Sequence, residues 1–384
     1  MRVLYVLDDF SERTAGTEGQ FLELVAGMRA RNAHVSIAVL RGGSTLANAL
    51  PGVPFLILGL TSLRSPGALR ALWKLVRWAR TQGSQVAHLY FNDVSIACPI
   101  PLRLAGLPVV VSRRDLGLWY TAGNLPMLRL NRWAVAAVIA NADAVKDRVI
   151  AQEHYPERKV LTIYNAWRDR PVSSDSGAVK AALGIPTNAR VLLSLGNLRP
   201  LKRVDDAIRI LALVRQELDN VWLCVVGADR VGKSGSEQFR LEALATELRV
   251  ADRIVFAGSR ADPWPIVQAC DIGLFCSESE GLSNALIEYS AAGKPTVCTG
   301  AGGNAEVVVD GKSGYIFPIG DVSSAAERLV GLLNDPALSV AMGAQGRQRV
   351  MEHFSVERMI DRHLNLYQGL LSDPGSPMRA HSNA

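Results

Sequence analysis

Cysteine is scarce in this sequence, and the few cysteines are not spaced for disulfides or metal. The chain has 384 residues and five cysteines, none of them in a C-x-x-C pair and most of them within apolar runs. This spacing excludes a disulfide-stapled domain and lacks the pattern of a zinc finger. We therefore expect small buried thiols in a protein of a reducing compartment.

Long apolar runs are also lacking. Nowhere do about 18 apolar residues follow one another, as a membrane-spanning helix requires, and Ala134–Ala140 is among the longest clean stretches. The run Met1–Leu7 meets two aspartates and is too short for a signal peptide. We expect a cytoplasmic protein without a membrane span. With 48% hydrophobic and 20% charged residues, the chain does not have the composition of a disordered protein.

Acidic residues are few in the first half of the chain, so the net charge of +6 is unevenly placed. Residues 1–165 carry 19 Lys and Arg against 11 Asp and Glu, whereas residues 166–384 carry 23 against 25. A basic half favours a polyanionic partner or an anionic membrane surface, although surface arginines also aid solubility. Nucleic acid is not expected as the partner, because the sequence has no RNP aromatic pattern and no Lys/Arg-rich block.

Short apolar stretches alternate with amphipathic ones along the whole chain. Such alternation is typical of parallel sheets that are covered by helices on both faces. The stretch Arg190–Leu195 opens a second round of the pattern, as Arg2–Leu7 opens the first. Helices are expected at Thr17–Arg29 and Pro66–Thr81, among others. The expected strands are Val3–Leu7, His34–Leu40, Pro54–Leu58, Gln85–Tyr90, Pro108–Ser112, Ala136–Ala140, Val160–Tyr164, Arg190–Leu195, Val221–Val226, Arg253–Phe256, Ile272–Phe275, Pro295–Cys298 and Gly314–Phe317.

The segment Asp169–Gly177 separates the two rounds. It is rich in Pro, Ser and Asp and shows no periodicity. We therefore predict an α/β fold of two Rossmann-like, doubly wound parallel-sheet domains facing a cleft, over residues 1–170 and 171–355. A helix over 356–371 follows, and the polar tail 372–384 is expected to be disordered. Sheets of this kind bind ligands at the carboxyl ends of their strands.

One short motif points to a different function. Residues Gly227–Ser234 match the P-loop pattern G-x-x-x-x-G-K-S, whose backbone N–H groups and lysine bind nucleotide phosphates. The motif follows a strand, but Gly235 and Ser236 separate it from the periodic helix that starts near Glu237. A surface loop is the favoured interpretation, and a P-loop NTPase is kept as an alternative function.

The stretch from Cys270 to Asp321 carries the clearest chemical pattern. An apolar strand is followed by an acidic loop and then by a helix, whose free N–H groups suit a phosphate or a sugar hydroxyl. Glu280 and Glu288 are eight residues apart, close to two helical turns, so both can face one ligand. A carboxylate can accept hydrogen bonds from two hydroxyls of a sugar. Taken alone, the pair also fits an exposed helix face.

The order of parts in this stretch points to a family. Glu280 and Glu288 enclose seven residues, followed by a small-residue helix, a Gly-x-Pro turn at 293–295, a strand and a Gly-Gly-x-x-Glu loop at 302–306. This order resembles the signature of glycosyltransferase family 4 (glycosyl transferases group 1), the retaining enzymes of GT-B fold that use nucleotide-diphosphate sugars. The resemblance implies that Glu288 binds the ribose of the donor and that Glu280 lies near the donor sugar. In similar proteins the final helix crosses back onto the first domain.

Basic residues upstream extend the resemblance to the diphosphate. Gly196–Lys202 is similar to the family's phosphate-binding loop, in which Lys202 matches the lysine. Asn197 stands where the family has an arginine, so Arg199 is expected to supply the second cation, with Arg203 as a further candidate. Negative charge grows on the leaving diphosphate, and preorganised cations there lower the barrier.

The resemblance implies further donor contacts. In the first domain, Gly16 and Thr17 resemble the family's Gly-Gly-x-Glu loop, with Ala15 in place of the first glycine. Thr17 and Gln20 have the spacing of a capping box, which would direct the N-terminus of this helix toward the ligand. The remaining donor-binding residues implied are Gly196, Asn197, Arg260, Gly281, Leu282, Ser283 and Asn284.

The expected acceptor side departs from the family pattern. Many members have a histidine after the strand written here as Pro108–Ser112, whereas this sequence has Arg113, Arg114 and Asp115. Either arginine is expected to bind a phosphate or an acceptor carboxylate, and Asp115 to act as the acceptor base. Asn165 resembles an asparagine of the family near the end of the first domain, and His88 is expected to be a buried or capping residue.

The segment Arg64–Arg80 has the pattern of a basic amphipathic helix. Between positions 69 and 80, four basic residues alternate with apolar residues, among them Trp73 and Trp78. Such a helix can lie on an anionic membrane, and it can equally be an ordinary helix that covers a sheet.

The resemblance implies a retaining hexosyltransferase-type glycosyltransferase. The expected donor is a UDP-, GDP- or ADP-sugar, and the acceptor a sugar or a lipid-linked molecule in bacterial cell-surface polysaccharide or glycolipid synthesis. The protein is expected to be peripheral on the inner face of the plasma membrane, through its basic first domain. No metal or other cofactor is expected, since the sequence has no Asp-x-Asp motif. A non-catalytic nucleotide-sugar-binding protein is the other alternative.

Overall fold

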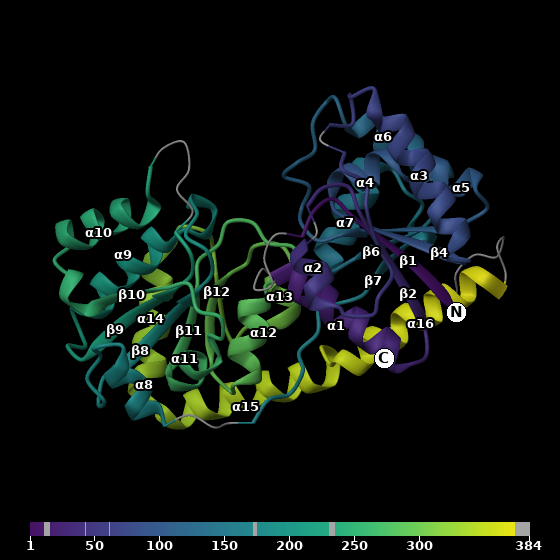
Figure 1. The fold of residues 1–384 in the computed structure, drawn as a ribbon. Coiled ribbons are helices and arrows are strands. Elements are labelled where there is room, and N and C mark those ends of the chain that lie inside the picture. Colours follow the sequence, from purple (N-terminus) through teal and green to yellow (C-terminus); the bar gives the residue numbers. More distant parts are fainter. Residues whose placement is uncertain (11–15, 43, 61, 172–174, 230–234, 373–384) are drawn as a thin grey trace. The chain divides into compact units, whose positions relative to one another are not determined.

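The computed structural model describes residues 1–10, 16–42, 44–60, 62–171, 175–229 and 235–372. Its contacts form two compact units: unit 1 comprises Met1–Ala166 and the chain from Val356 on, and unit 2 comprises Trp167–Ser355 (Figure 1). The last helix, α16 (Val356–Ser372), thus belongs to unit 1 although unit 2 precedes it in the sequence. Within the described ranges, no helix is long and apolar enough to cross a bilayer.

Unit 1 is built on a sheet of seven parallel strands in the order β3-β2-β1-β4-β5-β6-β7. Its central strands are buried on both faces, which explains their near-continuous apolar sequences. Figure 1 shows α3, α5 and α6 gathered on one side of this sheet and α1 and α16 on the other. The strands are β1 (Arg2–Leu7), β2 (His34–Val39), β3 (Phe55–Ile57), β4 (Val86–Tyr90), β5 (Val109–Arg113), β6 (Val135–Ala140) and β7 (Val160–Thr162). The helices besides α16 are α1 (Gly16–Ala30), α2 (Ser44–Ala49), α3 (Gly67–Thr81), α4 (Asn92–Ala97), α5 (Pro99–Leu104), α6 (Leu125–Leu130) and α7 (Asp143–Glu153), with the 3-10 turns η1 (Asn131–Trp133) and η2 (Glu157–Lys159).

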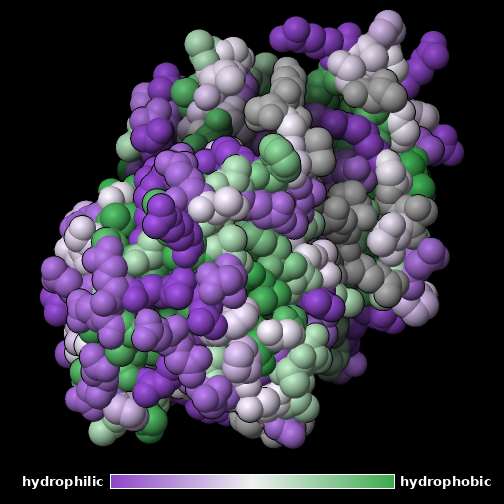
Figure 2. All heavy atoms as spheres, turned by 90° about the vertical axis from the view of Figure 1, so that its left-hand side faces the viewer, coloured by the Kyte–Doolittle hydropathy of each residue, from purple (hydrophilic) through white to green (hydrophobic). Residues whose placement is uncertain are grey.

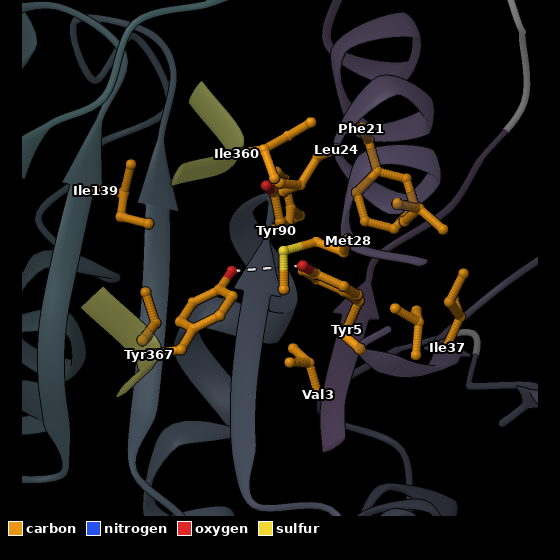
Figure 3. Packing of buried hydrophobic residues seen from close by; sticks show 14 of the residues in the cluster. Val3, Tyr5, Phe21, Leu24, Met28, Ile37, Tyr90, Ile139, Ile360 and Tyr367 are labelled. Atoms are coloured by element: carbon orange, nitrogen blue, oxygen red, sulfur yellow. Dashed lines mark hydrogen bonds between the residues drawn. The ribbon is translucent and has the colours of Figure 1, made fainter. Parts of the chain in front are cut away.

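Helix α16 completes the core of unit 1. Its buried residues join the cluster formed by β1, β2, β4 and α1, where Tyr5, Phe21 and Tyr367 lie close together (Figure 3). Gly27 of α1 comes so near to Ile360 that a Cβ at Gly27 would be 1.8 Å from Cδ1 of Ile360. The absence of a side chain at Gly27 therefore allows the two helices to approach.

A buried polar chain fixes α16 to the sheet. The hydroxyl of Tyr367 lies 2.6 Å from Nδ1 of His88 in β4, and Nε2 of His88 lies 2.8 Å from Oγ of Ser112 in β5. Burial lowers the pKa of His88 well below its ordinary value, so the imidazole is neutral. His88 is thus a buried structural residue, as its sequence context predicts.

Unit 2 repeats the same plan with six parallel strands in the order β10-β9-β8-β11-β12-β13. Hydrophilic side chains predominate over its outer helices, which face the viewer in Figure 2. The strands are β8 (Arg190–Leu195), β9 (Val221–Val226), β10 (Ile254–Gly258), β11 (Ile272–Phe275), β12 (Thr296–Thr299) and β13 (Gly314–Phe317). The helices are α8 (Ser176–Ala182), α9 (Val204–Val214), α10 (Glu237–Glu247), α11 (Trp264–Ala269), α12 (Asn284–Ala291), α13 (Asn304–Val307), α14 (Val322–Asn334) and α15 (Pro336–His353), with the 3-10 turns η3 (Pro200–Lys202) and η4 (Ala251–Arg253).

The predicted fold class is confirmed, and every predicted strand is present with ends within two residues of those expected. The five cysteines are free and buried. The expected capping box is wrong: α1 begins at Gly16, so Thr17 lies inside the first turn, and both polar ends of the Gln20 amide bond the backbone of Ala166 instead. The predicted disordered tail lies outside the described residues from position 373 on.

Candidate functional site

The strand order of unit 2 places a topological switch point between β8 and β11. These strands are neighbours in the sheet, and the chain continues from β8 to β9 on one side and from β11 to β12 on the other. Loops at the carboxyl ends of two such strands diverge and leave room for a ligand. The loop after β8 carries Gly196–Lys202 and the loop after β11 carries Glu280. The fold therefore brings the two predicted motifs to the same edge.

Lys202 and Glu280 meet at this switch point. Nζ of Lys202 is 2.5 Å from Oε1 of Glu280 and 5.1 Å from the ring centre of Phe275, the last residue of β11. The two charged side chains are 25% and 12% exposed, so water screens the ion pair only in part. Any anion that binds Lys202 has to compete with the carboxylate of Glu280.

Arg203 forms a second contact between the same two loops. Its backbone is left-handed, with a φ of 48°, a conformation that few non-glycine residues adopt. Its Nε lies 2.6 Å from the buried carboxylate of Asp206, and Nη1 lies 3.6 Å from Glu278. The hydrogen bond that Arg203 donates to Asp206 raises the pKa of Arg203. Arg203 is thereby occupied in holding the loops, whereas Arg199 is exposed.

Asn197 takes part in backbone positioning. Its Oδ1 accepts a hydrogen bond of 3.2 Å from the N–H of Ala228, which follows β9. Beside it, a Cβ at Gly227 would lie 2.0 Å from the carbonyl oxygen of Gly196, so the loops after β8 and β9 touch backbone to backbone. Arg260, beyond the end of β10, is exposed.

Helix α12 begins at the same edge of the sheet. Ser283 is its N-cap, with Oγ accepting from the N–H of Leu286 at 3.4 Å. The carbonyl of Gly281 accepts from the N–H of Gly303 at 2.9 Å, which joins the loop before α12 to the loop after β12. Leu282 is buried and Asn284 is half-buried. The positive end of the helix dipole is thus directed at the switch point.

Glu288 lies one turn along α12 and is half-buried. Burial raises the pKa of its carboxyl to about 7, although Arg170 opposes the shift. Arg170 makes a two-bond pair with Asp262, at 2.9 and 2.6 Å, and its guanidinium lies 5.6 Å from the ring centre of Trp264. No pattern in the sequence indicates this pair, because Arg170 and Asp262 are 92 residues apart and belong to no shared motif.

Tyr289 is a positioning residue that the sequence analysis also missed. Its buried hydroxyl accepts from the N–H of Leu195 at 2.7 Å and donates to the carbonyl of Leu193 at 2.9 Å. A Cβ at Gly273 in β11 would lie 2.3 Å from the ring. The tyrosine therefore fixes α12 against the carboxyl end of β8. Its position directly after Glu288 is the one sequence signal that could have found it.

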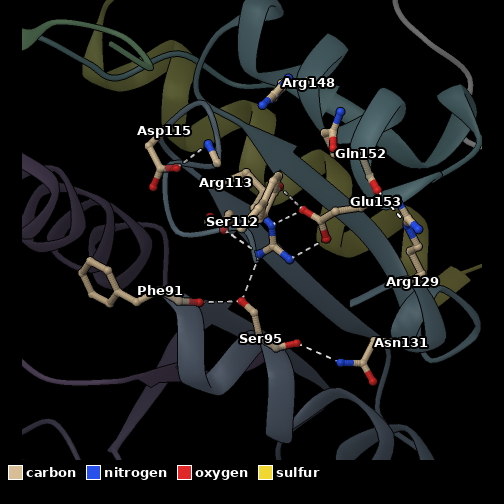
Figure 4. Close-up of polar contacts among 12 residues, drawn as sticks. Phe91, Ser95, Ser112, Arg113, Asp115, Arg129, Asn131, Arg148, Gln152 and Glu153 are labelled. Atoms are coloured by element: carbon tan, nitrogen blue, oxygen red, sulfur yellow. Dashed lines mark hydrogen bonds and ion pairs between the residues drawn. The ribbon is translucent and has the colours of Figure 1, made fainter. Parts of the chain in front are cut away.

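In unit 1, Arg113 is engaged inside the protein. Its Nε and Nη2 lie 2.6 and 2.9 Å from the two carboxylate oxygens of Glu153, and Nη1 donates to Ser95 and to the carbonyl of Ser112 (Figure 4). The side chains of Arg113 and Glu153 are 4% and 0% exposed. The sequence suggested that Arg113 contacts a substrate. In the structure its guanidinium instead forms an internal ion pair that joins β5 to the end of α7.

Arg114 points to a different group of residues. Its Nη2 lies 2.5 Å from Oδ1 of Asn165, and its guanidinium lies 6.0 Å from the ring centre of Tyr90. Nε of Arg114 is buried without a hydrogen-bond partner, and burial lowers the pKa of this arginine while the nearby Glu18 opposes the shift. Asp115 accepts the N–H of Gly117 at 2.6 Å. Tyr90 ends β4, Arg114 and Asp115 follow β5, and Asn165 follows β7, so all of them share the carboxyl edge of the sheet. The start of α1, with exposed Gly16 and half-buried Thr17, is at the same edge.

The P-loop match lies partly outside the described residues, which omit 230–234. The helix that follows it begins at Glu237, with Ser236 as its N-cap. Asp229 accepts from Oγ of Ser236 at 2.5 Å and from the N–H of Glu237 at 3.1 Å. This helix N-terminus is thus occupied by protein carboxylate and hydroxyl groups, which does not suit phosphate binding.

Two family models match the chain. Residues 14–167 match the model described as Glycosyltransferase Family 4, and residues 175–349 match the model described as Glycosyl transferases group 1. The structure is also similar to that of Anabaena Alr3699/HepE in complex with UDP and glucose, with a TM-score of 0.83 and 22% identity over 96% of this chain and 100% of the other. This likeness shows the fold class, which is the predicted GT-B class with two parallel-sheet domains.

Curated relatives include N-acetyl-alpha-D-glucosaminyl L-malate synthase of Bacillus anthracis, 30% identical over 234 residues, or 60% of each chain. The lipopolysaccharide core biosynthesis glycosyltransferase LpsE of Rhizobium meliloti is 28% identical over 229 residues, which cover 60% of this chain and 63% of the relative. The chain thus spans about three fifths of the length of the curated relatives that it matches.

Proposed function

We propose that this chain, in which a glycosyltransferase family 4 domain is followed by a glycosyl transferases group 1 domain, is a sugar transferase. It transfers a sugar from a nucleotide-diphosphate sugar to an acceptor with retention of configuration. The bond from the anomeric carbon to the donor phosphate breaks, a bond to the acceptor oxygen forms on the same face, and the hydroxyl proton leaves. The observation that carries this proposal is the meeting of Lys202, Glu280 and the start of α12 at one switch point.

Each group of unit 2 has a role that its surroundings support. Lys202, with exposed Arg199, would hold the diphosphate and stabilise the charge that develops on it. Glu280 would exchange its contact with Lys202 for hydroxyls of the donor sugar, and Glu288 would accept the hydroxyls of the ribose. The N-terminal end of α12, at Ser283 and Asn284, adds a dipole suited to the phosphates. UDP-, GDP- and ADP-sugars all fit these roles.

The proposal requires no metal or other cofactor. Two cations at the diphosphate can do the electrostatic work that a metal does in other transferases. Among the residues that the structure describes, His, Cys, Asp and Glu side chains do not gather in groups of three that could hold a metal ion.

We assign the acceptor to unit 1, where Arg114 would bind an acidic group and Asp115 would receive the hydroxyl proton. Buried Nε of Arg114 still has a proton to donate to such a group. Relatives whose names refer to L-malate and to lipopolysaccharide core fit an anionic acceptor and a role in cell-surface glycoconjugate synthesis in bacteria. The basic balance of the first half is consistent with an acidic acceptor.

Lys202→Met tests the proposal. Thermal shift of the full chain against UDP, GDP, ADP and their sugar conjugates first selects the donor, since binding to the native state raises its stability. With that donor, Lys202→Met is expected to lower the rate of transfer or of slow donor hydrolysis about 10²- to 10³-fold, the usual loss when one charge-stabilising group is removed. Glu280→Gln is expected to abolish transfer while the melting temperature stays close to that of the wild type.

The matched control is Lys312→Met, which removes an exposed lysine of unit 2 far along the sequence from both loops. It should leave binding and transfer unchanged. Equal activity of the Lys202 variant and this control would contradict the proposed diphosphate site. Binding of a nucleotide sugar without any transfer or hydrolysis would favour the non-catalytic alternative.

A further inference from the structure

Four neighbouring elements on one side of unit 1 carry many cations and no acids. Helices α3, α5 and α6 and the turn η1 contain no Asp or Glu at all. Their seven basic residues are Arg70, Lys74, Arg77, Arg80, Arg103, Arg129 and Arg132. Over the wider stretch 58–142 the chain has two acids, and Asp93 is paired with Arg41. The positive charge of α3, α5, α6 and η1 is therefore not neutralised by acids within these four elements; the acids of the layer lie on α4 and α7.

The same layer exposes large apolar side chains. Six of the twelve exposed large hydrophobic residues in the described chain lie on it: Leu69, Trp73, Leu104, Met127, Leu130 and Trp133. Leu69 is 79% exposed, Leu104 73% and Trp73 64%. Single exposed apolar residues are ordinary on protein surfaces, but a concentration of them marks a surface that meets another phase or partner. We call these six residues with the seven cations the basic face.

A groove of about 620 Å³ lies at one end of the basic face. It runs between α6 with η1 on one side and η2 on the other, and no acid lines it. Its lining residues are Pro126, Arg129, Leu130, Arg132, Trp133, Pro156, Arg158 and Lys159. Three guanidinium groups and one lysine ammonium group therefore surround a space that is also bounded by an indole and a leucine side chain.

Three of the four cations of the groove, Arg129, Arg132 and Lys159, bond backbone carbonyls rather than carboxylates. Nη1 of Arg132 donates to the carbonyl of His154 at 2.8 Å, and Nζ of Lys159 donates to the carbonyl of Val135 at 2.7 Å. Burial, together with the neighbouring charges of Arg158, Arg103 and Arg132, lowers the pKa of Lys159. These contacts fix the cations in place while leaving their charges uncompensated, as an anion site requires.

The groove is distinct from the candidate acceptor site. The turns η1 and η2 lead into the amino ends of β6 and β7, whereas Arg114 and Asn165 follow the carboxyl ends of β5 and β7. The parallel sheet therefore separates the two edges. Arg103 connects the groove to α5, and α5 contacts α3, so the basic face is continuous along the layer seen at the upper right of Figure 1.

We propose that the basic face binds the surface of an anionic lipid bilayer, with a lipid headgroup phosphate in the groove. The seven cations and the absence of acids complement a negatively charged surface. Trp73, Trp133 and the exposed leucines enter the interfacial region, where indole rings are favoured. A soluble phosphate would make use of the cations only, and would leave these apolar side chains in water. The binding site is independent of the proposed transferase activity.

Co-sedimentation of the full chain with vesicles tests the proposal. Vesicles of phosphatidylcholine with phosphatidylglycerol should bind the protein, and vesicles of phosphatidylcholine alone should bind it weakly. Each cation near an anionic surface contributes about 1 kcal/mol, so Arg129→Gln with Arg132→Gln should lower the partition coefficient roughly 10- to 30-fold. Trp73→Ala with Trp133→Ala should lower it about tenfold or more, because two large apolar contacts are lost. Raising the salt concentration should weaken binding of the wild type.

Matched variants in unit 2 serve as controls. Lys312→Gln with Arg328→Gln removes two exposed cations, and Phe239→Ala removes an aromatic side chain that is 74% exposed. Both should bind vesicles as the wild type does. A fall of similar size in these controls, no preference for anionic vesicles, or binding that the Trp pair leaves unchanged would each overturn the proposal. Competition by millimolar inorganic phosphate that abolishes the vesicle binding completely would instead assign the groove to a soluble anion.

Discussion

At the residue scale, the carboxyl of Glu288 links the proposed ligand to protonation. Burial raises its pKa to about 7, so near neutral pH a substantial fraction of the unliganded protein carries this group protonated. Hydroxyls that donate to the carboxylate favour its ionised form. We therefore expect binding of the nucleotide sugar, whose diphosphate has no group that titrates near neutral pH, to release a fraction of a proton near pH 6.5, and the affinity to rise with pH between about 6 and 8. Calorimetry in buffers of different ionisation enthalpy measures this release.

Glu288→Gln is the control for this prediction. The variant should bind the nucleotide sugar more weakly, without proton release and with an affinity that no longer depends on pH in this range. The sign for stability is the opposite of that for the usual carboxylate: the folded pKa of Glu288 lies above the ordinary value of 4.5, so the contribution of Glu288 to stability falls as pH rises from about 4.5 to 7. The variant should lose this contribution, while that of Asp8, whose pKa burial raises to about 6, remains. Proton release that persists in Glu288→Gln would place the titrating group elsewhere.

Residues of the site divide into those that a local pattern could predict and those that it could not. Lys202 and Glu280 each stand in a short motif after an apolar strand, and parallel topology brings such loops together. Arg113 stands in an equally suggestive position, but its partner Glu153 is 40 residues away and no local pattern indicates it. A buried ion pair is a property of the folded packing, which explains why the sequence suggested a substrate contact there.

At the element scale, the contact between α1 and α16 depends on Gly27. Glycine in the middle of a helix normally lowers stability relative to alanine by roughly 1 kcal/mol. Here a Cβ would lie 1.8 Å from Cδ1 of Ile360, so the side chain or the helix has to shift. We expect Gly27→Ala to destabilise the protein by about 1–3 kcal/mol, as overpacking does. Denaturant or thermal unfolding of the full chain measures the change.

Gly19 on the same helix provides the matched control, since a Cβ there meets no atom within 4 Å. Gly19→Ala should be neutral or should stabilise by up to about 1 kcal/mol. Ile360→Val removes the atom that Gly27→Ala would strike, so the double variant should be more stable than the sum of the two single changes indicates. Equal effects of the two alanine substitutions would show that α1 and α16 are not closely packed at Gly27.

Elements differ in how far the sequence predicts them. The strands are buried on both faces, and their apolar runs alone define them to within two residues. The start of α1 is different, because Gln20 has the spacing of a capping box but bonds Ala166, 146 residues away in the chain. Helix ends are decided by partners as well as by local pattern, and partners far along the chain leave no trace in a short window.

At the scale of the whole molecule, the two units have the same plan, but only unit 2 is formed by one continuous stretch of the chain. Unit 2 is a single stretch, Trp167–Ser355, and its core cluster uses only residues within that stretch. Unit 1 takes its last helix from the far end of the chain, and six residues of α16 are buried in its core. The sequence shows two rounds of strand and helix, but the apolar pattern of α16 does not specify the unit to which it belongs.

This difference predicts how fragments of the chain behave. Six buried side chains, at roughly 1.5–3 kcal/mol each, contribute on the order of 9–18 kcal/mol, which matches or exceeds the net stability of a typical domain. Fragment 1–166 should therefore fail to unfold cooperatively, and co-expression with residues 356–372 should restore a cooperative transition. Fragment 167–355 should fold by itself and bind the nucleotide selected with the full chain. Circular dichroism melts distinguish these outcomes.

A cooperative melt of fragment 1–166 alone would mean that α16 is attached to unit 1 without being needed for its fold. Failure of fragment 167–355 to fold would mean that unit 2 requires contacts outside its own core.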